Sequence, residues 1–299
     1  MKLTKIVAIS SLAALAITPV FAGAKSFKET VVVQEEAKPA WSASLSTGWD
    51  SLYMFRGVNV LRSNNKALNN GREDSNEWDN GIQWTAASFT YNLTENDSLT
   101  LSPWMGYGLA SAQSYKEFDI ALNYAHTIDA LTLGLGYTFY DVMNDGHQNY
   151  ANELNTSVAY NLDLGFMKLT PSVTYFYNIG PDNGDYVNGV NETNRGSLSS
   201  ASSYLSLRLD GSVAITDRLS LNPYVGYGIN FRQNWEDTKE FNGSNNVEYG
   251  VAAPFKINNT ISVSAYIAQS IAFQELGNAV GSDTRQFTTF GGAKVTFSF

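Results

Sequence analysis

The sequence contains no cysteine and only two histidines, and its 19 basic residues are outnumbered by 28 acidic ones. Without cysteine the chain cannot hold a disulfide framework, a thiolate nucleophile or the lipid-bearing cysteine of a lipoprotein. The net charge of −9 and the scattered Lys and Arg argue against a nucleic-acid-binding protein. The lack of cysteine does not by itself decide the redox compartment.

Long apolar runs are also absent. After the N-terminal segment there is no stretch of about 20 consecutive apolar residues, so the sequence predicts no transmembrane helix. At the N-terminus, Lys2 and Lys5 precede an apolar stretch at 6–17 and small residues that suit signal cleavage. Residues 1–24 are therefore predicted to be a secretory signal peptide, and the charged residues 25–40 a short periplasmic leader.

From residue 41 to residue 299, apolar and polar side chains alternate with a period of two, the pattern of strands with one apolar face. In the second predicted strand, Ile82 and Trp84 fall on one face but Phe89 and Tyr91 on the other, which predicts a bulge near 86–87. We expect twelve strands, at 41–56, 81–92, 99–111, 117–127, 131–141, 152–162, 168–178, 202–215, 219–231, 247–257, 260–273 and 286–299.

The connections between these strands differ in length in a regular way. Connections after even-numbered strands are short, and those after odd-numbered strands are mostly long and polar. Short turns at one end and long loops at the other are typical of outer-membrane barrels, whereas a β-sandwich has no reason to sort its loops. An even number of strands also places both termini at the short-turn, periplasmic end. The long connections are expected at 57–80, 142–151, 179–201, 232–246 and 274–285, with 112–116 as a short exception.

The last strand ends on an aromatic ring, because Phe299 is the final residue and Phe297 lies on the same face. A terminal strand that ends in Phe resembles the closing strand of bacterial outer-membrane β-barrels, which the barrel-assembly machinery recognises. Phe297 and Phe299 are therefore candidate assembly-signal residues.

Aromatic residues on the apolar faces gather near both ends of the predicted strands, as the two membrane interfaces require. We therefore predict an all-β fold: an antiparallel up-and-down transmembrane β-barrel of about 12 strands, at 41–299, with both termini periplasmic, in the outer membrane of a Gram-negative cell. The aromatic residues near the short turns are Trp41, Tyr124, Tyr160, Phe255, Phe297 and Phe299, and those near the long loops are Tyr53, Phe55, Phe139, Tyr175, Tyr177, Tyr227, Phe231, Tyr249, Phe273 and Phe287.

The segment Asp50-Ser51-Leu52-Tyr53-Met54-Phe55-Arg56-Gly57 resembles the Asp/Tyr-x-Phe-Arg-Gly signature that opens the TorF-type porin family, also called the Gcw_chp family. Residues 117–120 (Glu-Phe-Asp-Ile) and 136–141 (Gly-Tyr-Thr-Phe-Tyr-Asp) are similar to the next two recurring blocks of that family. The Glu-led strand that follows in the family corresponds to 152–154. The resemblance covers about the first half of the predicted mature chain. It implies a barrel porin with a poorly defined substrate and no catalytic residues.

The polar strand faces are expected to line the lumen, and twelve strands give a bore between that of eight-stranded and sixteen-stranded barrels. Two interpretations of the lumenal charges remain open. The first is an open hydrophilic pore with an acidic mouth and mild cation preference. In the second, Asp50, Arg56, Arg208 and Asp210 pair across the interior, satisfy one another and narrow or plug the pore. Arg56 is either a constriction residue or an anchor for the loop that follows Gly57. The predicted pore-lining residues are Asp50, Arg56, Asp119, Glu153, Arg208, Asp210, Glu248, Lys256 and Lys294.

Three functions fit such a barrel. The first is a porin-like channel for passive diffusion of small hydrophilic solutes or ions, and the second is a non-conducting structural or adhesive barrel that acts through its long extracellular loops. The third, a membrane-embedded hydrolase, is disfavoured because such sites need a His beside a Ser, and neither His126 nor His147 has one next to it. No cofactor, metal site or nucleic-acid partner is expected. The acidic stretches at 72–79 and 182–185 lack EF-hand spacing and are interpreted as solvated loops near lipopolysaccharide.

Overall fold

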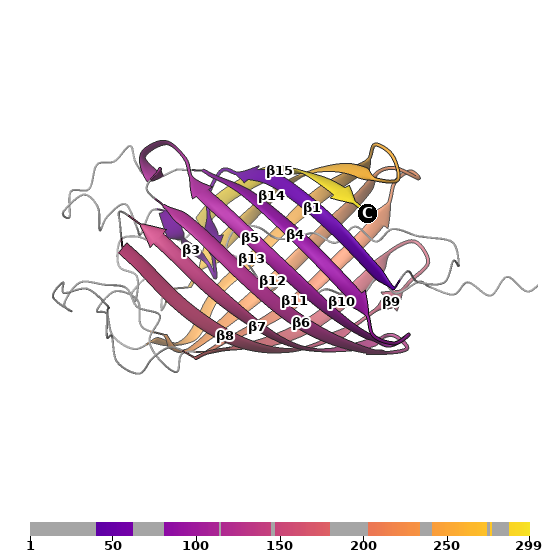
Figure 1. The fold of residues 1–299 in the computed structure, drawn as a ribbon, viewed down its shortest axis with the longest axis horizontal. Coiled ribbons are helices and arrows are strands. Elements are labelled where there is room, and N and C mark those ends of the chain that lie inside the picture. The colour runs from indigo at the N-terminus through magenta and orange to yellow at the C-terminus, as the bar shows by residue number, and fades with distance from the viewer. Residues whose placement is uncertain are drawn as a thin grey trace, which may run out of the picture.

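The computed structural model of the protein is a closed antiparallel β-barrel (Figure 1). It describes residues 40–61, 81–113, 115–144, 147–179, 203–233, 241–273, 276 and 287–299. Twelve long strands form the wall in sequence order, and the first and last of them pair to close it. The predicted all-β class, antiparallel up-and-down order and strand number are confirmed. The elements are β1 (Trp41–Asp50), β2 (Met54–Phe55), β3 (Val58–Asn59), β4 (Ile82–Asn92), β5 (Asp97–Gly108), η1 (Ala110–Ala112), β6 (Lys116–Ile128), β7 (Leu131–Asn144), β8 (His147–Tyr160), β9 (Leu162–Asp163), β10 (Lys168–Asn178), β11 (Ser203–Ala214), β12 (Ser220–Gln233), β13 (Phe241–Lys256), β14 (Ile261–Ala272) and β15 (Phe287–Ser298).

The two ends of the barrel wall meet at the same end of the molecule. Ser44 near the start of β1 pairs with Ser298 at the end of β15, and both strand ends lie on the right in Figure 1. The predicted signal peptide (1–24), the leader except for Ala40, and the acidic segments 72–79 and 182–185 lie outside the described residues. No helix in the described part of the chain is long and apolar enough to span a membrane.

Apolar side chains cover the outside of the barrel at alternate positions along each strand. Leu135 on β7 and Ile267 on β14, for example, are 54% and 58% exposed. A protein in water rarely exposes so large a continuous apolar surface, whereas a lipid-facing barrel requires it. The closed ladder also satisfies the backbone N–H and C=O groups of the wall, which hydrocarbon cannot hydrate. The architecture is that of an outer-membrane barrel.

Two connections are shorter than predicted. β7 and β8 remain paired up to Asn144 and His147, and β13 begins at Phe241, so 142–151 and 232–246 are not long loops. The prediction ended each strand where its apolar alternation stops. Backbone pairing continues beyond that point because ladder hydrogen bonds do not depend on apolar side chains.

The alternation in β4 is unbroken, so the bulge predicted near 86–87 is wrong. The register of β4 with β1 and with β5 stays constant along the strand. Phe89 and Tyr91 are exposed on the outside, whereas Ile82 and Trp84 are buried in the interior. Two apolar residues at inward positions require an apolar partner inside the barrel.

Candidate functional site in the barrel interior

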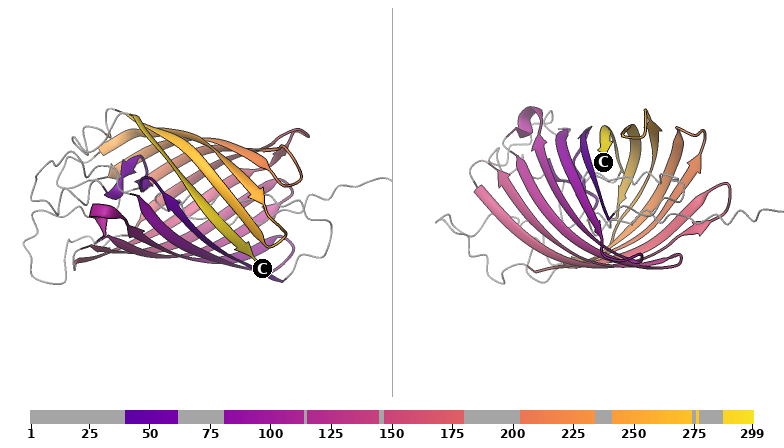
Figure 2. Two further views of the ribbon diagram at one scale, coloured as in Figure 1. Left: turned by 90° about the horizontal axis from the view of Figure 1, so that it is seen from above. Right: turned by 45° about the vertical axis from the view of Figure 1, so that its right-hand side comes forward.

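The apolar partner of Ile82 and Trp84 inside the barrel is the segment that follows β1. The chain leaves the wall after Asp50 and folds into the interior (Figure 2); we call residues 51–61 the lumenal hairpin. β2 and β3 pair as a small separate sheet. Arg56 and Gly57 between them have φ of 48° and 84°, the positive φ that a two-residue type I′ turn needs at both central positions. The first strand was predicted to span 41–56, and its predicted C-terminal end is wrong because β1 ends at Asp50. Apolar and polar residues continue to alternate beyond Asp50, but their side chains no longer face lipid.

Hydrogen bonds fix the point where the hairpin leaves the wall. The Asp50 carboxylate accepts hydrogen bonds from the Trp84 indole and from the Tyr266 hydroxyl, both at 2.8 Å. The backbone N–H of Ser51 donates to the Gly291 carbonyl at 2.8 Å, and the Ser51 Oγ accepts from the Gly291 N–H at 3.0 Å. A side chain at Gly292 would overlap Asp50 Oδ1. The root of the hairpin is thus tied to both β4 and the last two strands.

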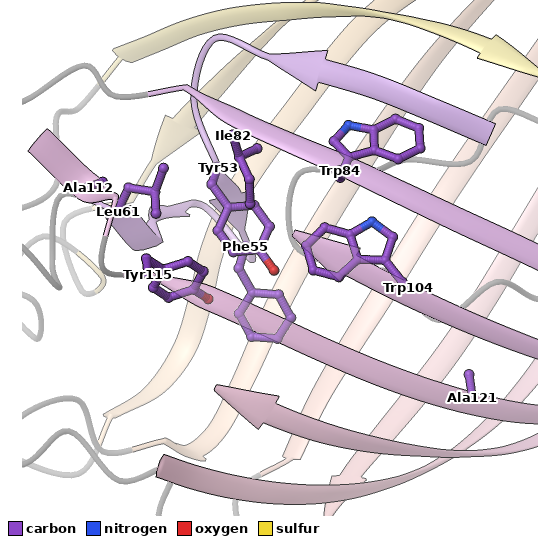
Figure 3. Close-up of a cluster of buried hydrophobic side chains, with 9 residues drawn as sticks. All are labelled: Tyr53, Phe55, Leu61, Ile82, Trp84, Trp104, Ala112, Tyr115 and Ala121. Atoms are coloured by element: carbon purple, nitrogen blue, oxygen red, sulfur yellow. The ribbon is translucent and has the colours of Figure 1, made fainter. Parts of the chain in front are cut away.

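One side of the hairpin packs its rings against β4, β5 and β6 (Figure 3). Tyr53 stacks on Trp104 with ring centroids 5.8 Å apart and ring planes 10° apart. Phe55 meets Tyr140 edge-on at 6.5 Å. Tyr53 and Phe55 were predicted in the outer aromatic belt, and that prediction is wrong because both rings are buried inside the barrel. The buried cluster comprises Tyr53, Phe55, Leu61, Ile82, Trp84, Trp104, Ala112, Tyr115 and Ala121.

Glu117 ties two tyrosines of this cluster together. The hydroxyls of Tyr53 and Tyr115 both donate to Glu117 Oε2, the latter at 2.5 Å. Burial, and then the neighbouring Glu117 carboxylate, raise the pKa of both tyrosines well above the usual value. Both hydroxyls therefore remain protonated donors.

The opposite side of the hairpin packs against the last strands. Leu52 and Met54 are buried in a second cluster with Tyr224, Ala268 and Phe290. This cluster and the ring cluster lie on opposite faces of the same short segment. The hairpin therefore packs apolar side chains against two parts of the barrel wall, one on each of its faces.

Amides hold the turn of the hairpin. The Asn245 side-chain amide on β13 donates to the backbone carbonyl of Arg56, and Asn230 on β12 donates to Asn245 Oδ1 at 2.6 Å. Gly57 lies against Asn246, where a Cβ would approach Asn246 Cγ to 2.8 Å. Glycine therefore serves both the positive φ and the close approach at this position.

The Arg56 side chain extends to β8. Its guanidinium lies 2.5 Å from Glu153 Oε2 on β8, with the two side chains only 6% and 5% exposed. Three rings surround it: the Cζ atom is 4.6, 4.9 and 4.6 Å from the ring centroids of Phe55, Phe176 and Tyr204. Burial lowers the pKa of Arg56, but the Glu153 carboxylate and the neighbouring tyrosines Tyr140 and Tyr204 together raise it, so the pKa lies above its usual value. Arg56 is therefore charged, buried and paired.

Taken together, these contacts span the whole cross-section of the barrel. The lumenal hairpin has a partner on each of the eleven long strands that follow β1, and it occupies the interior near the end opposite the short turns (Figure 2). The partners are Trp84 on β4, Trp104 on β5, Glu117 on β6, Tyr140 on β7, Glu153 on β8, Phe176 on β10, Tyr204 on β11, Tyr224 on β12, Asn245 on β13, Ala268 on β14 and Gly291 on β15.

The charged residues predicted to line the lumen occupy inward positions, except Arg56, which reaches the interior from the hairpin. Asp50, Asp119, Glu153 and Glu248 are buried, and Arg208, Asp210, Lys256 and Lys294 are half-buried. Their role along a permeation path stays a prediction.

Two ion pairs form among the predicted lumenal charges, Arg56–Glu153 and Arg208–Asp210, and only the second lies within the group that was expected to pair. Arg208 pairs with Asp210 on its own strand at 2.6 Å, and its Cζ lies 4.1 Å above the Tyr224 ring. The Tyr224 hydroxyl in turn donates to Glu248 at 2.8 Å. Arg56 pairs with Glu153 instead of an acid at 50 or 210.

Glu117 and the inward aromatic residues were not among the predicted site residues. Glu117 shares its strand face with Asp119, so its inward position follows from the same alternation. Trp84 gave a clear signal, since an aromatic residue at a polar-face position points to an apolar partner in the lumen. Tyr204, Tyr224 and Tyr266 gave none, because a tyrosine is acceptable on either face of a barrel strand.

The remaining candidate residues lie away from the hairpin. His126 Nδ1 is 2.8 Å from Asp97 Oδ1, and its cross-strand neighbours are Asp97 and Leu133, so no Ser stands beside it across the described strands. The side chain of His147 lies outside the described part. Phe299 pairs by its backbone with Ala43, at 2.8 Å from its N–H to the Ala43 carbonyl, while its ring is 69% exposed. Within the described residues no group of three or more His, Asp or Glu could hold a metal ion.

No protein-family model matches the chain, and no curated protein matches it either. Among solved structures, it resembles an outer-membrane channel from Pseudomonas putida F1 at 12% identity and a TM-score of 0.52, over 88% of this chain and 97% of the channel. It also matches the KdgM porin at 8% identity and a TM-score of 0.44, over 86% and 99% of the two chains. The outer membrane phospholipase A from Escherichia coli matches at 11% identity and a TM-score of 0.45, over 86% and 95%. At these identities the likeness to the channel establishes the fold, a barrel of the outer-membrane type.

Proposed function

We propose that the protein is an outer-membrane channel for small hydrophilic solutes or ions whose lumen is constricted by its own hairpin. The observation that carries the proposal is the contrast between the two faces of the wall. The outside is apolar, whereas inward positions hold polar and charged groups around the whole circumference. A barrel that serves only as an anchor does not need a hydrophilic interior, whereas a solute path does.

The lumenal hairpin sets the narrowest level of the proposed path. Asp50, Glu117, Asp119, Glu153 and Glu248 surround it, whereas Arg56 is the basic residue of the same level. Arg56 is paired with Glu153, and carboxyl groups outnumber basic groups at this level. Any current through the constriction is therefore expected to favour cations mildly.

The experiment that tests this function is single-channel recording of the refolded protein in a planar bilayer under a salt gradient. Discrete conductance steps, with a reversal potential of the sign that cation preference requires, are the expected result. A correctly folded barrel that never conducts would refute the channel. In that case the function would lie in the long loops, as in a structural or adhesive barrel.

Membership of the TorF-type family and the cellular setting belong to the same proposal. The segment 50–57 that resembles the family signature is the root and turn of the lumenal hairpin, so a structural role for the signature supports the resemblance. We propose that residues 1–24 direct export, that both termini face the periplasm, and that the loops at the opposite end meet lipopolysaccharide.

Deleting Phe299 tests the proposed role of the last strand in assembly. Phe299 is expected to act in recognition by the assembly machinery more than in packing, because its ring is exposed while its backbone completes the β1–β15 ladder. We expect the deletion to reduce the heat-modifiable, membrane-inserted form in cells several-fold, while refolding in detergent is nearly unchanged. Substitution of Leu45, which pairs with Phe297, by Ala serves as the control. Normal insertion of the deletion variant in cells would count against the assembly signal.

A further inference from the structure

Below the lumenal hairpin, toward the short turns, the interior face of β5–β8 carries polar side chains without partners. Ser102, Asn123, Thr138, Asn155 and Ser157 are all less than a tenth exposed. The hydroxyls of the three Ser and Thr residues, and both polar atoms of each Asn amide, have no hydrogen-bond partner in the described part of the chain. We call these five residues the amide wall.

The five residues are neighbours in three successive inward rows of the sheet. Ser102 and Thr138 flank Ala121, and Asn123 and Asn155 flank Gly136. Ser157 lies one row further toward the short turns. A Cβ at Gly136 would overlap Asn123 Oδ1 and come within 2.6 Å of Asn155 Nδ2. The absence of a side chain at Gly136 therefore lets the two amides converge.

The five side chains of the amide wall are polar but uncharged. The charged group on its upper row, Glu153, is already bound to Arg56. Among the other inward charges, Arg208 and Asp210 lie on β11, which β10 separates from β8, and they pair with each other. Lys256 and Lys294 lie farther round the barrel, on β13 and β15. Buried polar atoms of this kind are satisfied by water or by a ligand.

We propose that the amide wall is a subsite for uncharged, hydroxyl-rich solutes such as sugars and polyols. A hydroxyl group both donates and accepts, so it can satisfy an amide N–H and an amide oxygen together. An ionic solute would lose hydration at this wall, and the five residues of the wall offer it no charged partner. A weak site of this kind assists permeation because it favours entry without preventing exit. This inference rests on the proposed channel function and names its solute class.

The test measures efflux of radiolabelled glucose, gluconate and glucosamine from liposomes that contain the refolded protein. These three probes are similar in size and differ in charge. Wild-type protein is expected to release glucose faster than either charged probe. The double variant Asn123→Ala/Asn155→Ala is expected to lower the glucose-to-gluconate rate ratio about fivefold or more, since one lost hydrogen bond changes an equilibrium by about that factor.

Asn222→Ala provides the matched control, because Asn222 is a buried inward amide on β12 that bonds Ser212 and lies outside the amide wall. This variant should keep the wild-type ratio, and heat-modifiable gel mobility verifies that all variants fold. Equal rates for the three wild-type probes, faster efflux of a charged probe, or an unchanged ratio in the double variant would overturn the subsite and leave the channel intact. A folded barrel that releases none of the probes and conducts no salt would overturn the channel, and the subsite with it.

Discussion

Replacement of residues 52–61 by a Gly/Ser segment of equal length is expected to raise the single-channel conductance several-fold. The replacement removes the rings of Tyr53 and Phe55 and the guanidinium of Arg56 from the interior, while the anchors of Asp50 and Ser51 to the wall remain. A twelve-stranded barrel without an internal segment has a bore between that of packed eight-stranded barrels and open sixteen-stranded porins. Planar-bilayer recording in symmetrical salt gives the comparison directly.

The control for this replacement is Tyr53→Phe, which keeps the ring that stacks on Trp104 and removes the hydroxyl that donates to Glu117. Because the filled volume is nearly unchanged, the conductance should stay at the wild-type level. Equal conductance of the wild type and the hairpin replacement, with both folded by gel mobility, would show that the hairpin does not limit the path.

Glu153→Ala is expected to cost about 3–5 kcal/mol of unfolding free energy, the range for breaking a buried ion pair by removing one partner. The substitution leaves the Arg56 guanidinium buried among three rings without its counter-ion. Urea titration in phospholipid vesicles, followed by tryptophan fluorescence, measures the change. The double variant Arg56→Met/Glu153→Leu should recover much of the loss, because no uncompensated charge then remains inside.

Asp210→Ala is the matched comparison. It also removes the acid of an interior Arg–acid pair, but the side chains of Arg208 and Asp210 are 21% and 39% exposed. Water can hydrate the Arg208 that is left, so the expected cost is below about 1 kcal/mol. Similar losses in Asp210→Ala and Glu153→Ala would mean that the Arg56–Glu153 pair is not the main anchor of the hairpin.

The barrel wall was predictable from the sequence because its physical requirement is local and repeated. Each strand must place apolar groups in lipid and polar groups inside, so a period of two appears twelve times, and the short turns between strands are visible as polar breaks. The errors at the strand ends near Asn144 and Phe241 arose where the strands extend beyond the apolar belt. In these strand ends the backbone pairing continues, but apolar and polar side chains no longer alternate.

The lumenal hairpin was not predictable by the same means, because alternation only distinguishes two faces and cannot say what each face touches. Tyr53 and Phe55 continue the apolar positions of β1, so the pattern is the same for a lipid-facing strand and for a segment folded into the lumen. The sequence held two indirect signals of the hairpin. Gly57 suits a turn, and Ile82 and Trp84 fall on the face of their strand that points into the barrel. The partners of Arg56 depend on strands far along the chain, and single-residue patterns hold no information on such pairings.

The hairpin also constrains the order of events during biogenesis. Its root bonds Gly291, 240 residues further along the chain, and its remaining contacts extend over strands from β4 to β15. A segment made early in synthesis therefore finds its partners only after the last strand has arrived, and contacts of such long sequence separation form late. Until then its aromatic side chains have no interior in which to be buried, and during that interval chaperone protection matters most. Docking of the hairpin would accordingly report that the seam between β1 and β15 has closed.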